Sequence, residues 1–395
     1  MTCTMILWKT FYMSKENFDY IILGTGAAGL NLALAMEADP YFDDKKILLL
    51  DRAPKVHNDR TWCFWEKGKG KWDDILLANW DKLEFISDNF DKTIPLEGYR
   101  YKMLKGLDFY RFCLGVLETK TNFSILYDDV TKINERSDSV EITGKIQTYH
   151  TKHVFSSILD YKPDETGMPS LSQHFGGWFI KTQQPVFKDA APQFMNFKIP
   201  QNGNTCFIYV LPYKEDEALF EYTFFSKDVL TKKNYDDFLK QYLEQQQLAD
   251  YQILEREYGE IPMTSYPFWK KNTKRKTYIG SAGGYTKPST GYTFYFCQKY
   301  SIDLVNRIKS NQDLSQFSVY NRHYWYDNIL LGVLEKNNHL GKTIFSNMFA
   351  KNRILSILRF LNNESSLLED IMIIAKTKYP LTFFTSLLRT LKFKI

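Results

Sequence analysis

Three closely spaced glycines follow the first apolar segment of the chain, in the stretch Gly24-Thr25-Gly26-Ala27-Ala28-Gly29. The pattern G-x-G-x-x-G, placed between a strand and a helix, is typical of a turn that binds the pyrophosphate of a dinucleotide. Gly24 permits the tight turn, Gly26 lets the backbone approach the phosphates, and Gly29 allows close helix packing. The helix that begins here supplies amide donors and positive partial charge. The alternative is a glycine turn in an α/β protein that binds no nucleotide.

Asp51 stands 22 positions after Gly29, where a carboxylate of a βαβ unit can bind a ribose diol. A second glycine cluster, Gly280-Ser281-Ala282-Gly283-Gly284, comes late in the chain, and Thr290 and Gly291 follow it before a helical run. In flavoproteins with a site in two parts, such a segment brings amides to the flavin end of FAD, whereas NAD is held by the first unit alone. The alternative is a plain loop before a helix. We therefore expect FAD as the cofactor.

Glu221 is the residue best suited to acid chemistry, because it lies within the apolar stretch Ala218 to Phe225. An ionised carboxylate is costly in such surroundings unless it is paired, so this side chain is expected to stay protonated and to donate its proton. The alternative is a carboxylate that points to solvent from an edge strand. Aromatic residues make up 16% of the chain, which fits either core filling or a large pocket lined by rings. The candidates to line such a pocket are Trp62, Phe64 and Trp65.

The elements that must position these residues indicate an α/β fold. Phe18 to Leu23 and Lys46 to Leu50 are short apolar runs of the buried parallel-strand type, and the Ala/Leu-rich stretch Ala27 to Met36 predicts a helix between them. Asn58 to Glu66 is interpreted as an aromatic loop. A strand-rich region follows, with a helix after it, at Trp178 to Lys181, Phe194 to Phe197, Thr205 to Leu211, Leu219 to Ser226 and Tyr235 to Gln245.

These elements predict a Rossmann-type FAD-binding domain of the two-dinucleotide-fold flavoprotein architecture, with an inserted antiparallel-sheet substrate domain and a helical C-terminal region. Its expected segments are an N-terminal extension (1–17), the first and second parts of the FAD-binding domain (18–160 and 266–310), the substrate domain (161–265) and the helical region (311–395). Met13 is as natural a start as Met1, because the first strand begins near Phe18.

Composition excludes several classes of protein. The net charge of +5 is modest and the lysines are dispersed, which argues against nucleic acid as a partner. Five cysteines form no CxxC pair, and the six histidines have no metal-ligand spacing, so we expect no disulfide framework and no metal site. No apolar run approaches the roughly 20 residues that span a bilayer, and the first residues lack a signal-peptide cleavage site. A reducing cytoplasm fits these features.

Four further stretches, in this order after the first glycine turn, resemble the bacterial-type lycopene β-cyclases: Asn58-Asp59-Arg60-Thr61-Trp62-Cys63-Phe64-Trp65, Leu219-Phe220-Glu221-Tyr222-Thr223-Phe224, Gly259-Glu260-Ile261-Pro262-Met263, and Gly280 to Phe294. The resemblance runs from about Asp19 to Tyr292 and more loosely to the end of the chain. It implies a flavoprotein that folds the acyclic ψ-ends of lycopene into β-rings, giving γ-carotene and then β-carotene. It also implies reduced FAD, with NAD(P)H as reductant, and no net electron transfer to the product.

The residues give this chemistry a physical basis. Ring closure requires protonation of a terminal alkene, attack of a second double bond on the cation, and loss of a proton, and Glu221 is the expected acid. Many family members carry a second acid directly after it, but this chain has Tyr222 there, so Glu221 is the only acid in the stretch Leu219 to Phe224. Tyr222 and Glu260 are further candidates to line the substrate site. An anionic reduced flavin and ring faces would stabilise the cation in a dry site.

Two other functions remain open from the sequence. One is a redox flavoenzyme of the same architecture, such as a flavin monooxygenase or a prenyl-chain reductase acting on a lipophilic substrate. The other is a catalytically silent flavoprotein that binds carotenoid or membrane.

Lycopene and related acyclic carotenoids reside in the bilayer, so the resemblance implies peripheral docking on a membrane surface. Apolar or amphipathic stretches suited to this occur near the end of the chain, at Ile354 to Leu361, Leu367 to Ala375 and Thr382 to Leu391. They are accompanied by basic residues that favour anionic lipid, namely Lys376, Lys378, Arg389, Lys392 and Lys394. Ordinary packing helices that close the core are the alternative, and the two are compatible.

Overall fold

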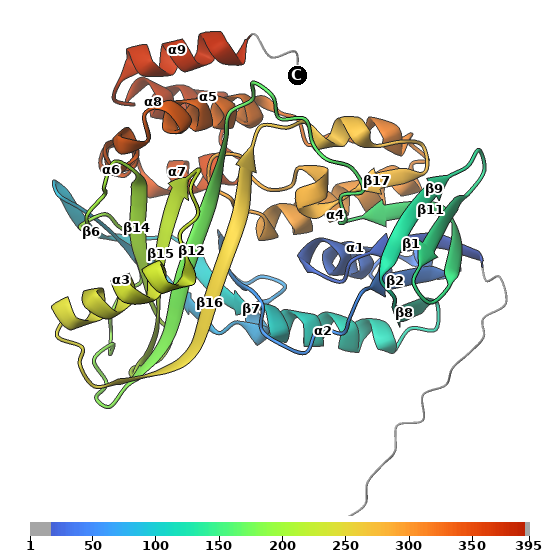
Figure 1. The fold of residues 1–395 in the computed structure, drawn as a ribbon, viewed down its shortest axis with the longest axis horizontal. Coiled ribbons are helices and arrows are strands. Elements are labelled where there is room, and N and C mark those ends of the chain that lie inside the picture. Colours follow the sequence, from blue (N-terminus) through green and yellow to red (C-terminus); the bar gives the residue numbers. More distant parts are fainter. Residues whose placement is uncertain (1–16, 392–395) are drawn as a thin grey trace, which may run out of the picture.

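A computed structural model describes residues 17–391. The expected N-terminal extension, apart from Asn17, and the basic residues Lys392 and Lys394 lie outside this range. Figure 1 shows two sheets side by side, with the strands nearest the N-terminus in one and the long strands of the middle of the chain in the other. Helices from the last third of the chain lie across the top of the second sheet.

The first sheet forms as the apolar runs predict. β1 (Asn17–Leu23) pairs in parallel with β2 (Ile47–Asp51), and α1 (Ala27–Glu37) connects them. All residues of β2 are buried, as expected of a parallel strand covered on both faces. The sheet is completed by parallel strands β8 (Phe123–Tyr127), β11 (Thr148–Ser156) and β17 (Lys276–Tyr278), and by antiparallel β9 (Val130–Glu135) and β10 (Val140–Gly144).

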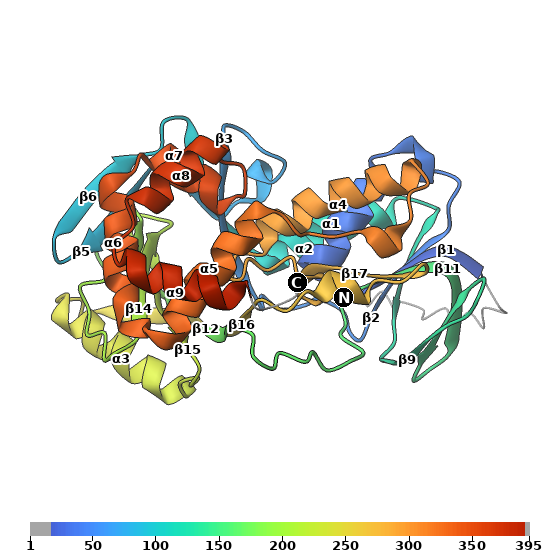
Figure 2. The same cartoon turned by 90° about the horizontal axis from the view of Figure 1, so that it is seen from above.

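Three helices share one hydrophobic core with this sheet. α1 packs beside α4 (Phe294–Lys309), and α2 (Gly106–Glu118) lies along the same layer, as Figure 2 shows from above. The late strand β17 therefore joins the sheet of the first βαβ unit. Short 3-10 helices occupy Pro40–Phe42, Asp73–Ile75, Phe268–Lys271, Gly280–Gly283, Leu314–Gln316 and Asn338–Leu340.

The second sheet has the strand order β16-β12-β15-β14-β13-β5-β6. Its members are β16 (Tyr251–Thr264), β12 (Ser170–Thr182), β15 (Glu217–Ser226), β14 (Thr205–Pro212), β13 (Gln193–Asn196), β5 (Lys82–Ser87) and β6 (Phe90–Pro95). α3 (Lys232–Gln245) packs on one face through a separate aromatic and aliphatic cluster. The other face packs partly on α5 (Arg322–Lys336), α6 (Gly341–Lys351) and α7 (Ile354–Leu361).

The second sheet differs from the prediction in two respects. Strands β5 and β6 come from the segment assigned to the first part of the FAD-binding domain, and β13 pairs with β5 in parallel. The longest strand, β16, was not predicted, because Glu255 and Glu257 interrupt the alternation of apolar residues along it.

The aromatic stretch after the first βαβ unit is also a strand where a loop was expected. β3 (Thr61–Lys67) pairs with β7 (Tyr99–Lys105), which pairs in turn with β4 (Ala78–Trp80). This small sheet brings the aromatic residues of β3 against both hydrophobic cores. Their side chains are therefore held in fixed positions.

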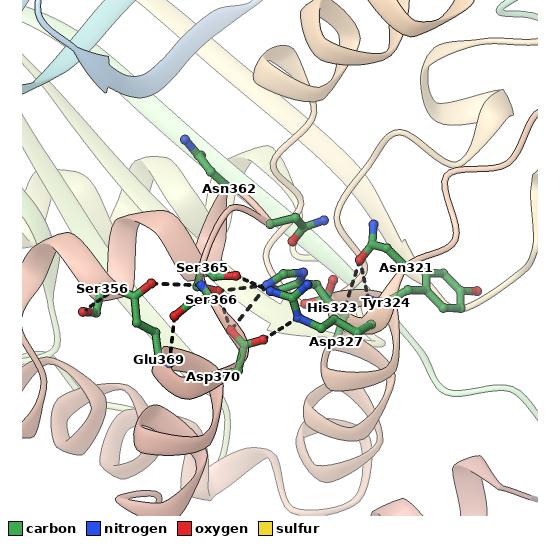
Figure 3. Close-up of polar contacts among 12 residues, drawn as sticks. Asn321, His323, Tyr324, Asp327, Ser356, Asn362, Ser365, Ser366, Glu369 and Asp370 are labelled. Atoms are coloured by element: carbon green, nitrogen blue, oxygen red, sulfur yellow. Dashed lines mark hydrogen bonds and ion pairs between the residues drawn. The ribbon is translucent and has the colours of Figure 1, made fainter.

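A buried polar cluster fixes the C-terminal helices to the start of α5 (Figure 3). Arg322 donates to Asp370 at 2.7 Å, and His323 Nε2 lies 2.9 Å from Ser365 Oγ and 3.5 Å from Asp370 Oδ1. Burial lowers the pKa of His323 to about 4, so its ring is neutral at pH 7. In a nucleophilic triad the serine and the acid contact different ring nitrogens of the histidine. Here Nε2 of His323 contacts both Ser365 and Asp370. The cluster is therefore structural.

The last two helices are α8 (Leu367–Ala375) and α9 (Pro380–Thr390). α9 lies against α5, where the hydroxyl of Ser386 donates to the carbonyl of Ile329 at 2.7 Å. Many of the apolar side chains of α8 and α9 point away from the core and are exposed. Within residues 17–391, no helix is both long and apolar enough to cross a bilayer.

Candidate active site

The first glycine turn has the geometry that a pyrophosphate requires. Gly24 adopts φ +95°, which side-chain-bearing residues rarely adopt, and a Cβ atom at Gly29 would lie 1.9 Å from the carbonyl oxygen of Gly24. A Cβ atom at Gly26 would instead meet nothing within 4 Å. Gly26 is the N-cap of α1, without a side-chain cap and without an acidic residue in the first turn. The amides at this helix end are thus available to an anion.

Asp51 lies at the carboxyl end of β2, beside this turn. Its Oδ2 atom accepts hydrogen bonds from the backbone N–H and the hydroxyl of Thr25, both at 2.7 Å, and Lys55 lies 3.4 Å away. These partners outweigh burial and keep the pKa of Asp51 below its ordinary value. An ionised carboxylate at this place can accept hydrogen bonds from a ribose.

The second glycine segment lies directly against the first. Gly280 has φ +63°, and a Cβ atom there would lie 2.9 Å from the Cβ atom of Ala28. Gly291 has φ +73°, and a Cβ atom there would lie 2.1 Å from Oε1 of Gln173. That oxygen is buried and has no hydrogen-bond partner among the described residues. A buried acceptor without a partner at a cavity wall is suited to a polar edge of a bound cofactor.

A cavity of about 460 Å³ connects this glycine-rich end with the second sheet. Gly26, Ala27, Ala28, Gly280 and Gly291 line one end of it. The other cofactor-binding candidates do not line the cavity, namely Gly24, Gly29, Asp51, Gly283, Gly284 and Thr290. The glycines among them shape the two turns. Thr290 is buried, and its hydroxyl has no hydrogen-bond partner among the described residues. No group of three or more potential metal ligands occurs among residues 17–391.

Glu221 lies at the other end of the cavity, on the face of β15 that looks toward the glycine turns. Residues alternate between faces along a strand, so Leu219 and Glu221 line the cavity while Phe220 and Tyr222 pack under α3. Glu221 pairs with Gly177 on β12 and with Tyr209 on β14. Its Oε1 atom accepts a hydrogen bond from Thr223 at 3.1 Å.

The surroundings of Glu221 favour its protonated form. Burial and then the nearby carboxylate of Glu257 raise the pKa of Glu221 to about 8, and the hydrogen bond from Thr223 offsets only part of this. At pH 7 the side chain is thus mainly a neutral acid. The proton donor expected from the apolar stretch is placed where it can act on a molecule in the cavity.

Glu257 is a second acid in the cavity that sequence reasoning missed. It is buried on β16, pairs with Gly177 from the side opposite Glu221, and accepts hydrogen bonds from Thr61 N–H at 2.9 Å and Thr61 Oγ1 at 2.7 Å. Burial is the largest influence on its pKa, which is raised, although the two bonds from Thr61 oppose this. Two carboxylates two positions apart, at 255 and 257, were the available sequence signal.

The aromatic candidates divide between cavity and core. Trp62 lines the cavity and stacks on Phe294 with ring centroids 4.8 Å apart. Phe64 packs in the core below, also against Phe294. Trp65 packs against Tyr292 and donates from its indole N–H to the carbonyl of Leu358 in α7 at 3.1 Å. Of the three, only Trp62 borders the cavity.

Two further candidates lie on the opposite face of the second sheet. The ring of Tyr222 stacks on Phe238 of α3 at 3.5 Å between centroids, so its side chain lies on the face of the sheet away from the cavity. Glu260 is exposed on the edge strand β16, where its carboxylate accepts a hydrogen bond from Ser172 at 2.5 Å, although part of the residue borders the cavity. Strand alternation gives both side chains the orientation opposite to those of Glu221 and Glu257.

Comparison with known proteins decides the family. Residues 19–391 match the family model described as lycopene cyclase protein. The chain belongs to the lycopene cyclase family. A lycopene β-cyclase of Paracoccus sp. (strain N81106 / MBIC 01143) is 24% identical over 293 residues, which cover 70% of this chain and 70% of that protein. The resemblance drawn from the four sequence boxes is thereby confirmed.

Solved structures confirm the fold class. A flavoprotein/dehydrogenase of Cytophaga hutchinsonii aligns with a TM-score of 0.63 at 9% identity, covering 94% of this lycopene cyclase family chain and 99% of the other. A geranylgeranyl bacteriochlorophyll reductase-like protein of Thermoplasma acidophilum aligns with a TM-score of 0.60 at 14% identity, covering 94% of this chain and 99% of that protein. A flavin-dependent brominase aligns with a TM-score of 0.56 at 12% identity, covering 94% of this chain and 98% of that protein. These likenesses concern the Rossmann-type flavoprotein fold alone.

Proposed function

We propose that this family member is a lycopene β-cyclase in which Glu221 is the proton donor. The observation that carries the proposal is a carboxylic acid with a pKa of about 8, facing a cavity whose other wall is the paired glycine turn of a dinucleotide-binding unit. A general acid with a pKa near the operating pH combines a useful protonated fraction with a driving force for proton transfer. Family membership supplies the carotenoid as substrate class.

The proposed reaction conserves atoms and electrons. The O–H bond of Glu221 breaks as its proton joins the terminal double bond of a ψ-end, which leaves a tertiary cation. The neighbouring ring-forming double bond attacks that cation and closes the six-membered ring. Loss of a proton from the new ring then restores a double bond, so the product is an isomer of the substrate. The same sequence at the other ψ-end converts γ-carotene into β-carotene.

FAD is the cofactor that the two glycine segments are proposed to hold. The amides of Gly26 and the start of α1 would bind the pyrophosphate, Asp51 a ribose, and the segment from Gly280 to Gly291 the flavin end. When bound in its reduced, anionic form, with NAD(P)H as the reductant, the flavin supplies negative charge that favours a cationic intermediate. Trp62 and Phe175 at the cavity wall exclude water, which would otherwise capture the cation.

The proposed enzyme reaches its substrate by docking on a cytoplasmic membrane surface through α8 and α9. Large apolar side chains are exposed on these two helices: Leu367, Leu368, Ile371, Met372 and Ile374 on α8, and Leu381, Phe384 and Leu388 on α9. The basic residues Lys376, Lys378 and Arg389 accompany them. Apolar side chains flanked by basic ones are suited to the interface of an anionic bilayer. We refer to these exposed apolar residues as the α8–α9 patch.

The decisive experiment expresses the full chain in lycopene-producing cells and identifies the carotenoid product. A cyclic product of unchanged mass is expected. Purified, FAD-loaded protein given preformed lycopene in D₂O should add one deuterium per ring, because Glu221 exchanges its proton with solvent between turnovers and the donated deuteron stays on carbon. A gain of two hydrogens or of oxygen would instead support the alternative, a redox flavoenzyme such as a prenyl-chain reductase or a flavin monooxygenase. Bound FAD without any product would support a silent binding protein.

Glu221→Gln tests the assignment of the acid. General acids contribute typically about 10²–10⁴-fold, so we expect cyclisation to fall by at least about a hundredfold with FAD content retained. Glu217→Gln is the matched control: Glu217 lies on the same strand but pairs with Lys181 and Lys214 and does not border the cavity. Near wild-type cyclisation by Glu221→Gln would overturn the assignment.

A further inference from the structure

We propose that Glu221 and Glu257 form a carboxylic acid pair that retains one proton between them, with the proton on Glu221 and the negative charge on Glu257. The role of the pair in cyclisation rests on the function proposed above. The existence of the pair is a property of the second sheet, and it can be tested without any substrate.

The register of three strands places the two carboxylates. Gly177 on β12 is opposite Glu221 on β15 and opposite Glu257 on β16. Residues directly opposite one another in a sheet point to the same face, so all three face the cavity, and both acids border it. Two strand spacings separate the backbones of the acids by about 10 Å. Because Gly177 has no side chain, the two acid side chains can extend toward each other over it.

Hydrogen bonds determine which acid carries the charge. Glu257 accepts from two donors of Thr61, one on each carboxylate oxygen, at 2.9 and 2.7 Å. Glu221 accepts from one donor, the hydroxyl of Thr223, at 3.1 Å. Donors stabilise the ionised form of a carboxyl group, and shorter bonds do so more strongly. The negative charge therefore resides on Glu257, and Coulomb repulsion from it disfavours ionisation of Glu221.

The other titratable groups facing the pair do not change this assignment. Toward Glu221 these are Tyr209 on β14 and Cys63 on β3, and burial raises the pKa of both, so they are neutral at physiological pH. The groups that face Glu257 are Glu255 and Arg60. The negative charge of Glu255 raises the pKa of Glu257, and the positive charge of Arg60 lowers it. Glu255 is itself paired with Lys105 at 2.7 Å.

The pair has a consequence for turnover. Once Glu221 has given its proton to the substrate, two carboxylates face each other across Gly177, and their repulsion makes the Glu221 carboxylate an unusually strong base. It is thus the group that takes back the proton released by the new ring: a C–H bond breaks and the O–H bond of Glu221 forms again. The pair returns to its starting state with no proton gained or lost.

Infrared titration of the full-length protein tests the pair without measuring activity. We expect a protonated carboxyl band at pH 7 that is absent in Glu221→Gln and that titrates near pH 8 in the wild type. In Glu257→Gln the midpoint should fall by at least one pH unit, because the repelling charge is gone. Glu244→Gln, which removes an exposed carboxylate of α3, should leave the midpoint unchanged.

Thr61→Val provides a second variant that keeps both acids. It removes one hydrogen-bond donor to Glu257. The titration should show two steps, and the midpoint of the lower step, which belongs to Glu257, should rise. The midpoint of the upper step, which belongs to Glu221, should stay near pH 8. The pair is overturned if Glu257→Gln leaves the Glu221 midpoint in place, and the assignment is reversed if Thr61→Val raises the midpoint of the upper step and leaves that of the lower step unchanged. Neither result depends on cyclisation, so a failure of the proposed function would be distinguished from a failure of the pair.

Discussion

Gly177 and Glu221 lie opposite each other on β12 and β15, and a Cβ atom at position 177 would lie 3.4 Å from the Cβ atom of Glu221 and 3.0 Å from Cδ1 of Leu219. The neighbouring Gly176 faces the other way, where a Cβ atom would lie 2.5 Å from Cβ of Tyr235 in α3. Two adjacent glycines thus serve different purposes. One keeps space open between the acids, and the other lets a helix approach the sheet.

Gly177→Ala should therefore impair catalysis more than stability. The added methyl group meets ordinary to tight contacts, and alanine restricts the unfolded chain, so we expect the free energy of unfolding to change by less than about 1 kcal/mol. Cyclisation should fall about tenfold or more, because a small displacement of the acid is costly in rate. Gly176→Ala is the matched control and should lose about 1–3 kcal/mol through overpacking. Urea unfolding and turnover measure both, and equal activity losses per folded molecule would contradict this division of roles.

Cyclisation should decline as pH rises through about 8. The folded-state pKa of Glu221 lies above its ordinary value, so the active, protonated form predominates below pH 8 and is lost tenfold per pH unit above it. The same sign holds for stability: a carboxyl whose pKa is raised by folding contributes unfavourably above its unfolded value of about 4.3. The pH profile of turnover by enzyme with constant FAD content provides the measurement. A rate that rises with pH between 7 and 9 would exclude Glu221 as the acid.

Gly26→Val should reduce FAD content while the fold is retained. No atom lies within 4 Å of a Cβ at this position, so the new side chain enters only the space expected for the pyrophosphate. Gly29→Ala is the contrasting variant, because its methyl group would lie 1.9 Å from the carbonyl oxygen of Gly24 and should destabilise the fold itself. Flavin absorbance per protein and thermal unfolding separate the two effects. Full FAD content in Gly26→Val would mean that the cofactor binds elsewhere.

The α8–α9 patch should control binding to anionic liposomes. Leu368 and Leu381 are 70% and 80% exposed, and burying a leucine side chain contributes about 1.5–3 kcal/mol, so their joint replacement by serine should weaken binding tenfold or more. Ile146→Ser is the control, since Ile146 is 77% exposed but lies between β10 and β11. Point substitutions are preferable to deletion of α9, whose Ser386 binds α5. Flotation unaffected by the double substitution would contradict docking through this patch.

Local sequence determined the parts of the protein that depend on short-range constraints. The first glycine turn, the buried run of β2 and Asp51 are all specified within about thirty residues, because tight turns and buried parallel strands restrict residue type at each position. Glu221 was identifiable for a similar reason, as a single acid in an apolar stretch. The resemblance to lycopene cyclases, carried by short boxes of residues, led to the family.

Tertiary structure alone decided which face each residue occupies and which acids meet. β16 lies next to β12, about eighty residues earlier in the chain, and only this pairing brings Glu257 opposite Gly177 and Glu221. A shift of one residue in that register would send Glu257 to the other face, where Tyr222 and the carboxylate of Glu260 in fact lie. Local patterns do not encode such long-range registers. The sequence by itself therefore pointed to the acid that we propose as the proton donor, and the packing of the second sheet supplied its partner.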